Sequence, residues 1–448
     1  MKNLITKTVS LVMAVILIFA SFTTFSSIEV QANESVSVHA ESAIIVDAKT
    51  GKILYEKQSD LKLPPASMTK MMTEYLVLEA INNGDISWDT TTQISDYAYS
   101  ISADSTFSGI GLKQDKDYTV RQLYEGMSII SDNATTIALA ELIAGSEAEF
   151  VQMMNEKAKE MGLPEYKFVN STGLANEDLG ENYPEGTEAN GYNLLSARSA
   201  ALLAYHLIND YPEALDFSST TRSELDNQPL QNLNWMLPEW DDNNFVQYGY
   251  KGVDGLKTGY TDEAGYCFTG TAKQGDRRLI TVVMKTGSKG ERFEETAKLM
   301  DYGFSQFTSE ELFPKGYQIE EESTLPVTKG KESEVEIATN TSVQSMIKEG
   351  EKDLYQLRYE INEENLTGEG ALEAPVEEGE KVGEAVLEYT GDANNDYIEG
   401  IGGEQRVDVV ATNAVEKSNW FMLMLGAIGD FFGNVYHTVV DTVQGWFS

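Results

Sequence analysis

The order of apolar patterns along the chain most constrains its fold. Residues 42–47 are typical of a β-strand, and a turn at 49–52 leads into a second strand at 53–55, so this part predicts a hairpin. The next strand patterns occur at 253–285. Within them, residues 279–284 are mostly apolar, which is typical of a strand buried on both faces. A helix is predicted at 294–302.

Between these strands, apolar residues recur with helical spacing. Four helical stretches are predicted, at 67–81, 121–145, 148–161 and 195–209. Strands first, helices next and strands last indicate an α/β (α+β) domain of residues 33–312 whose two ends share one sheet.

The rest of the chain predicts a second domain of a different class. Residues 313–316 are typical of a linker. Beyond it, short alternating segments are separated by Gly, Asn and Glu clusters, at 335–337, 357–361, 385–387 and 407–409. This pattern predicts a small all-β domain over 316–411.

Both termini are predicted to have roles outside these domains. Residues 1–32 combine an early positive charge, an apolar core and a small-residue end at Ala32, which predicts a Sec signal peptide rather than an uncleaved anchor. Residues 419–448 predict an amphipathic helix that lies in a membrane interface as an anchor, or alternatively docks on protein. It contains no Lys or Arg, which weakens simple attraction to lipid.

Composition excludes several function classes. A formal net charge of −39 argues against nucleic acid as a partner, since phosphate binding needs basic patches. The lone Cys267 is more typical of a buried apolar residue than of a nucleophile. The three histidines are scattered, so neither a Ser-His-Asp triad nor a zinc site is expected; they are His39, His206 and His437. We therefore expect no metal and no cofactor.

A Ser-x-x-Lys motif begins the predicted helix at Ser67. Positions three apart share one helix face, so Lys70 should lie beside Ser67. A serine hydroxyl needs a base to become a nucleophile, and burial or a nearby positive charge can lower a lysine pKa enough to provide one. At the helix start, the Ser67 backbone N–H is also placed to stabilise an oxyanion.

A second motif, Ser131-Asp132-Asn133, precedes another helix. Ser131 is a candidate to relay a proton, and Asn133 to orient Lys70 and a substrate amide. The same residues are also typical of a helix cap, and both interpretations can hold.

The third motif is Lys257-Thr258-Gly259, at a predicted strand. Lys257 and Thr258 are candidates to bind a substrate carboxylate, and Gly259 leaves room for an extended peptide at the strand edge. Tyr260 would offer its N–H as a second oxyanion donor. A second copy of this motif at 285–287 follows a buried strand, and we interpret it as chance.

The three motifs, in this order, resemble those of serine β-lactamases and penicillin-binding proteins. The stretches 65–73, 170–174, 254–261 and 264–266, with the two-domain plan and the C-terminal anchor, make the chain resemble the low-molecular-mass penicillin-binding proteins that act as serine-type D-Ala-D-Ala carboxypeptidases.

That resemblance implies roles for particular residues. Ser67 would form the acyl-enzyme, Lys70 would accept its proton, Ser131 would assist, and Lys257 and Arg292 would lie near the substrate carboxylate. The implied partners are peptidoglycan stem peptides as substrates, β-lactams as covalent inhibitors and the outer face of the cell membrane. The implied reaction removes the terminal D-alanine of pentapeptides.

Two alternatives stay open on the sequence. A class A β-lactamase needs a Glu four residues before an Asn between the second and third motifs, and 175–193 contains no such pair. A non-catalytic wall-binding protein would not need intact motifs. The way the protein reacts with a labelled penicillin distinguishes these alternatives from a carboxypeptidase.

Overall fold

The structure is a computed structural model that describes residues 36–368, 370–391, 396–398 and 405–419. The predicted signal peptide, the C-terminal helix and His437 lie outside the described residues. No helix in these described ranges is long and apolar enough to cross a membrane.

Residues 36–306 contain most of the helices that the structure describes. The helices are η1 (Ala66–Thr69), α2 (Lys70–Asn83), α3 (Asp96–Ala103), α4 (Val120–Ile130), α5 (Asn133–Ala144), α6 (Glu147–Glu160), η2 (Asn176–Asn182), α7 (Ala197–Asp210), α8 (Ala214–Ser218), η3 (Val246–Tyr248) and α9 (Glu291–Gln306). The strands are β1 (Ser42–Asp47), β2 (Ile53–Lys57), β3 (Thr91–Thr92), β4 (Tyr118–Thr119), β5 (Tyr166–Lys167), β6 (Leu194–Leu195), β7 (Arg222–Leu225), β8 (Gln228–Gln231), β9 (Val253–Thr261), β10 (Gly265–Gln274) and β11 (Arg277–Thr286).

The predicted sharing of one sheet by distant segments is confirmed. The order is β2-β1-β11-β10-β9, so the N-terminal hairpin pairs with β11 and β9 forms an edge. The β1–β11 pairing is antiparallel and sets Ile44 opposite Val282 and Ile45 opposite Thr281.

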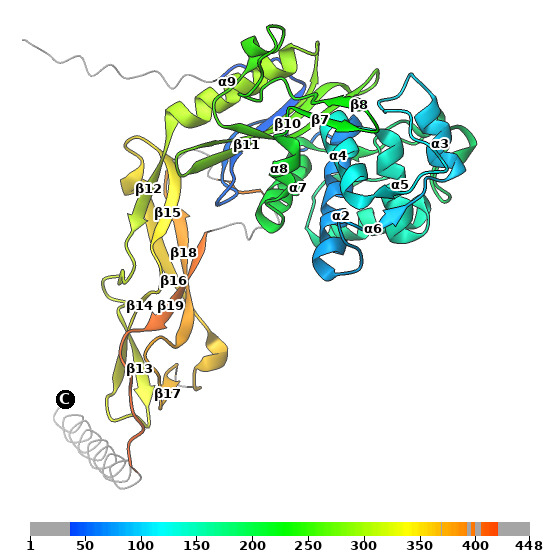
Figure 1. The fold of residues 1–448 in the computed structure, drawn as a ribbon. Helices are drawn as coiled ribbons and strands as arrows, with labels where there is room; N and C mark the ends of the chain where they lie inside the picture. The colour runs from blue at the N-terminus through cyan, green and yellow to red at the C-terminus, as the bar shows by residue number, and fades with distance from the viewer. Residues whose placement is uncertain (1–35, 369, 392–395, 399–404, 420–448) are drawn as a thin grey trace, which may run out of the picture. The chain divides into compact units, whose positions relative to one another are not determined.

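Helices cover both faces of this sheet, which explains its continuous apolar strands. Ile44, Val282 and their neighbours on one face pack in the same core as α7. On the other face, an added Cβ at Gly303 of α9 would meet Ile45 and Leu279 within 2.8 Å, so α9 lies close to the strands. Figure 1 shows α9 on one side of the sheet and α7 and α8 on the other.

The long helical stretch predicted at 121–145 is two helices. α4 ends at Ile130, and the next residue, Ser131, is left-handed with a φ of 61°. Asp132 then caps α5 by accepting a hydrogen bond from Thr135 N–H at 2.9 Å. The apolar periodicity did not predict this break, because both helices have apolar inner faces and their patterns run on from one to the other. The predicted last helix, 294–302, is also longer in the structure, since α9 spans Glu291–Gln306.

The C-terminal part is β-rich, as predicted. Its elements are β12 (Phe307–Phe313), β13 (Thr324–Thr328), β14 (Glu334–Thr339), β15 (Val343–Lys348), η4 (Lys352–Leu354), β16 (Tyr355–Ile361), η5 (Glu363–Asn365), β17 (Leu372–Glu373), β18 (Lys381–Tyr389) and β19 (Arg406–Ala411). β12 pairs with β15, which places residues 307–313 with the β-rich part rather than with the domain predicted over 33–312. The boundaries 33–312 and 316–411 stay predictions, and this pairing favours a change nearer Phe307.

Candidate active site

Ser67 lies on a short turn that is wedged against two other segments. Ala66, directly before it, has a left-handed φ of 47°. An added Cβ at Gly173 would lie 1.9 Å from the Ala66 carbonyl oxygen, and one at Gly259 would lie 2.3 Å from that of Pro65. Both positions therefore require glycine, and the turn is held from two sides. For Gly259 this close contact with the turn, rather than room for substrate, is the reason that the structure provides.

Lys70 begins α2 directly after this turn. Its Nζ lies 3.1 Å from Ser67 Oγ, and it donates hydrogen bonds to Asn133 Oδ1 and to the Thr172 carbonyl oxygen, both at 2.8 Å. The sequence singles out 170–174 but assigns it no role, because a backbone carbonyl makes this contact and no side-chain signal marks it.

The electrostatic surroundings of Lys70 suit a base. The side chain is fully buried. Burial, and after it the nearby charge of Lys257, hold the pKa of Lys70 well below its usual range. Desolvation disfavours the ammonium form, so a larger fraction of Lys70 is neutral at a given pH than of an exposed lysine.

Ser131 and Asn133 reach the site from the junction of α4 and α5. The Ser131 Oγ is buried and has no hydrogen-bond partner among the described residues. Asp132 caps α5 with one carboxylate oxygen, and its other carboxylate oxygen accepts a hydrogen bond from Ile110 N–H at 3.0 Å. Within this one motif, Asp132 caps a helix while Ser131 and Asn133 reach the site.

The third motif lies on β9, the edge strand. Lys257 and Thr258 are both buried, and Tyr260 is half exposed and stacks on Tyr266 with ring centroids 4.4 Å apart. An edge strand leaves backbone groups free to pair with an extended peptide.

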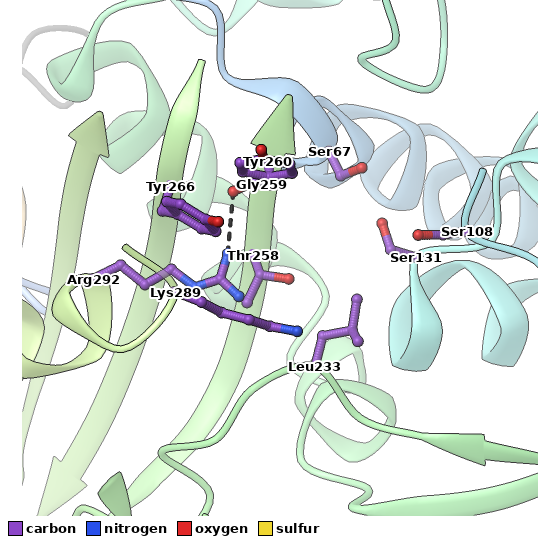
Figure 2. A pocket seen from close by; sticks show the side chains of 10 residues that line it. All are labelled: Ser67, Ser108, Ser131, Leu233, Thr258, Gly259, Tyr260, Tyr266, Lys289 and Arg292. Atoms are coloured by element: carbon purple, nitrogen blue, oxygen red, sulfur yellow. Dashed lines mark hydrogen bonds between the residues drawn. The ribbon is translucent and has the colours of Figure 1, made fainter. Parts of the chain in front are cut away.

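A cavity of about 330 Å³ connects these motifs. Ten residues line it and none is acidic; they are Ser67, Ser108, Ser131, Leu233, Thr258, Gly259, Tyr260, Tyr266, Lys289 and Arg292. Figure 2 shows the Ser67 and Ser131 hydroxyls facing each other across it, with Lys289 reaching in from the opposite side. Ser108, Leu233 and Lys289 belong to no motif and were not predicted, whereas Tyr266 ends the stretch 264–266, to which the sequence assigned no role.

Arg292 joins this cavity from α9. It is buried and donates a hydrogen bond to the Gly259 carbonyl oxygen at 3.1 Å (Figure 2). Burial lowers the pKa of Arg292 to about 10, so it remains a cation at neutral pH. Arg292 therefore lies beside β9, and its role at the substrate carboxylate stays a prediction.

Several residues considered on the sequence lie elsewhere. Lys285, of the second Lys-Thr-Gly copy, does not line the cavity and pairs with Glu41 at 3.0 Å. Cys267 is buried on β10, and burial raises its pKa to about 11. His206 lies 3.4 Å from Asp210, also outside the cavity lining.

One group of side chains in the described part has atoms of the metal-ligand type close together. The ligand atoms of His39, Glu291 and Glu295 lie within 4.8 Å of one another. None of the three lines the cavity, so this group is separate from the serine chemistry.

Comparison with protein families matches both parts of the chain. Residues 28–288 match the D-alanyl-D-alanine carboxypeptidase model, and residues 307–417 match the penicillin-binding protein 5 C-terminal domain model. The chain belongs to the D-alanyl-D-alanine carboxypeptidase family. This membership confirms the resemblance inferred from the three motifs.

Individual relatives agree with this assignment. The chain is 33% identical over 393 residues to the D-alanyl-D-alanine carboxypeptidase DacF of Bacillus subtilis, covering 88% of this chain and 92% of that one. The solved structure of PBP3 from Streptococcus pneumoniae, titled a peptidoglycan synthesis regulatory factor, has a TM-score of 0.70 and 35% identity, covering 84% of this chain and 99% of that one. Penicillin-binding protein D2 from Listeria monocytogenes, solved in cefotaxime-bound form, has a TM-score of 0.51 and 32% identity, covering 60% and 99%.

Proposed function

We propose that this family member uses Ser67 as the nucleophile of a serine-type D-Ala-D-Ala carboxypeptidase. The observation that carries the proposal is the buried Lys70 Nζ at 3.1 Å from Ser67 Oγ, with Asn133 and Thr172 fixing its direction. A base at this distance with a lowered pKa is what a serine nucleophile requires.

The reaction then follows from the positions of these groups. Ser67 Oγ attacks the carbonyl carbon of the penultimate D-alanine while Lys70 takes its proton. Backbone N–H groups of Ser67 and Tyr260 stabilise the oxyanion. The peptide C–N bond breaks, the proton passes by way of Ser131 to the departing nitrogen, and D-alanine leaves. Water then hydrolyses the ester and restores the Ser67 hydroxyl.

The terminal carboxylate of the substrate is bound at the opposite end of the cavity. Thr258 and Arg292 line the cavity there, Lys257 is buried directly before Thr258 on β9, and the cavity lining contains no acid to oppose the two cations. Charge-assisted hydrogen bonds of this kind give both affinity and orientation. Gly259 allows β9 to lie against the Ser67 turn, which brings the carboxylate end and the nucleophile together.

Penicillin sensitivity is part of the same proposal. The Listeria relative was solved with cefotaxime and, in a second structure, with ampicillin. A β-lactam has an amide carbonyl and a carboxylate, so it fits the same pair of subsites and acylates Ser67. Slow hydrolysis of this ester separates a carboxypeptidase from a β-lactamase.

The substrate and the location follow from the family. We propose peptidoglycan stem pentapeptides as substrates, export directed by residues 1–32 and attachment to the outer face of the membrane through residues 419–448. The amphipathic pattern of the tail supports attachment from one side, without crossing the membrane.

The test is release of D-alanine from diacetyl-Lys-D-Ala-D-Ala by the mature protein. Ser67→Ala should abolish release and labelling by a fluorescent penicillin, whereas Ser100→Ala, on the exposed part of α3, should leave both unchanged. D-alanine release that survives Ser67→Ala contradicts the mechanism. Rapid turnover of the penicillin label indicates a β-lactamase, and absence of both activities indicates a wall-binding protein.

A further inference from the structure

Lys289 brings a positive charge into the cavity from the segment that joins β11 to α9. It lines the cavity together with Thr258 and Arg292, and Figure 2 shows its ammonium end extending into it. Lys70 and Lys257 are buried and do not belong to the lining. Arg292 and Lys289 are therefore the cations that the cavity presents to a ligand.

No acidic side chain neutralises Lys289 within the part of the chain that the structure describes. Its Nζ forms no ion pair or hydrogen bond there, and its close contact is with the ring of Trp235, whose centroid lies 4.9 Å away. An ammonium group is attracted to an aromatic face, but it keeps its charge and its three N–H donors. Trp235 therefore directs Lys289 without occupying the groups that would bind a ligand.

Trp235 is itself held in place by other rings. Their centroids lie 4.9, 5.3 and 5.5 Å from that of Trp235, and they belong to Phe245, Tyr248 and Phe293 in that order. The backbone after Lys289 is also closely packed, because an added Cβ at Gly290 would lie 2.5 Å from the Tyr248 hydroxyl oxygen. Lys289 thus starts from a packed backbone and ends over a packed ring, which places its charge.

The other cation of the lining, Arg292, has a structural role as well. Its Nη1 donates hydrogen bonds to the carbonyl oxygens of Gly259 at 3.1 Å and of Cys267 at 3.4 Å, on the neighbouring strands β9 and β10. These bonds fix the guanidinium, and they use donors that a carboxylate would otherwise receive. The N–H donors of Lys289 are not used in this way, so Lys289 can give all of them to a ligand.

The composition of the chain makes an unpaired cation at this place informative. The chain has 72 acidic and 33 basic residues, so its overall field repels a negatively charged ligand, and an exposed lysine has many potential acidic partners. The cavity lining contains none of these acids. Lys289 therefore adds positive charge where an anion would otherwise be repelled, and the anion that the proposed substrate carries is a carboxylate.

We propose that Lys289 binds the terminal carboxylate of the substrate beside Thr258 and Arg292, and that it makes the enzyme select peptides with a free C-terminus. A peptide that ends in an amide, or that continues beyond the second D-alanine, has no charge at this position and gains nothing from Lys289. This inference rests on the proposed function, because the proposed function places the carboxylate at this end of the cavity.

The test compares diacetyl-Lys-D-Ala-D-Ala with the C-terminal amide of the same peptide, in wild type and in Lys289→Met. The free acid has a single carboxylate, so the difference between the two peptides concerns the C-terminus alone. Methionine can still pack on Trp235 but has no charge. Because one charge-assisted hydrogen bond is lost, we expect kcat/KM to fall roughly tenfold for the acid and by less than about twofold for the amide.

Two further variants serve as controls. Lys285 lies four residues earlier, is exposed and pairs with Glu41 outside the cavity lining, so Lys285→Met should keep the wild-type kcat/KM for both peptides. Lys289→Arg keeps a cation and should retain most of the rate on the acid. An unchanged rate on the acid in folded Lys289→Met, or an equal loss on both peptides, overturns the inference.

Benzylpenicillin separates a failure of this inference from a failure of the proposed function. It also carries a carboxylate, so Lys289→Met should lower its rate constant for acylation of Ser67 by a similar factor. This expectation holds even if wild type releases no D-alanine, a result that contradicts the carboxypeptidase proposal alone. If wild type does not cleave the amide at a measurable rate, the comparison of Lys289→Met with Lys289→Arg on the acid decides, and equal rates for the two overturn the inference.

Discussion

Gly173→Ala tests how firmly the Ser67 turn is held. Gly173 has a φ of +88°, and an added Cβ would lie 1.9 Å from the Ala66 carbonyl oxygen and 2.9 Å from Thr69 Oγ1. Alanine in a left-handed conformation costs about 1–2 kcal/mol. Because ordinary contacts lie near 3.5 Å, the Ala66 carbonyl would also have to move by roughly 1.5 Å. Ser67 follows directly in the chain and would move with it.

A displacement of about 1 Å at a reacting group can reduce the rate roughly 100-fold. We therefore expect Gly173→Ala to be acylated by benzylpenicillin about 100-fold more slowly than wild type, measured as the second-order rate constant. The backbone cost predicts a melting temperature lower by roughly 2–8 °C for a domain of this size.

Gly84→Ala is the matched control. Gly84 has a similar φ of +81° at the far end of α2, and its added Cβ would meet no atom within 4 Å. It should lose stability to a similar extent and be acylated at the wild-type rate. Wild-type acylation by Gly173→Ala would refute the claim that this contact positions Ser67.

Two further predictions concern pKa values. The kcat/KM for D-alanine release should rise with pH as Lys70 loses its proton and fall as Lys257 loses its own. Because burial lowers both pKa values, both changes should occur below the ordinary lysine pKa of about 10.4. A full pH–rate profile that falls only at the ordinary value would contradict this. Cys267, whose pKa burial raises to about 11, should not react with iodoacetamide at pH about 8 in the folded protein and should react in urea; labelling of the folded protein at the rate of free cysteine would show that it is accessible.

Much of the fold was predictable because its signals are local. The hairpin at 42–55, the buried strand at 279–284 and the four segments predicted as strands in the β-rich part each have a periodicity that a short window contains. The break between α4 and α5 was less visible, since it depends on the left-handed Ser131 and on an Asp132 side chain that reaches Ile110. The strand pairing of β12 depends on β15, 30 or more residues away, and no local signal reports it.

The candidate site shows the same division. Motif spacing predicted that Lys70 lies beside Ser67 and that β9 is a strand at an edge. It did not predict the Thr172 carbonyl contact, because backbone atoms have no sequence signature. Glu74 on α2 illustrates a further limit, since a glutamate within a helix normally indicates a solvent-facing position, whereas this one is only 2% exposed. Its burial becomes visible only when α4 and β9 pack around α2.

The close packing of Gly173 and Gly259 against the Ser67 turn also determines when, during folding, the protein becomes active. The three segments are separated by more than 80 residues of chain at each step, so the nucleophile reaches its position only after these long-range contacts have formed. A chain that is still unfolded would have Ser67 but no activity. Reaction with a penicillin therefore reports completed folding of the domain, and timed labelling during refolding would record when the last of these contacts closes.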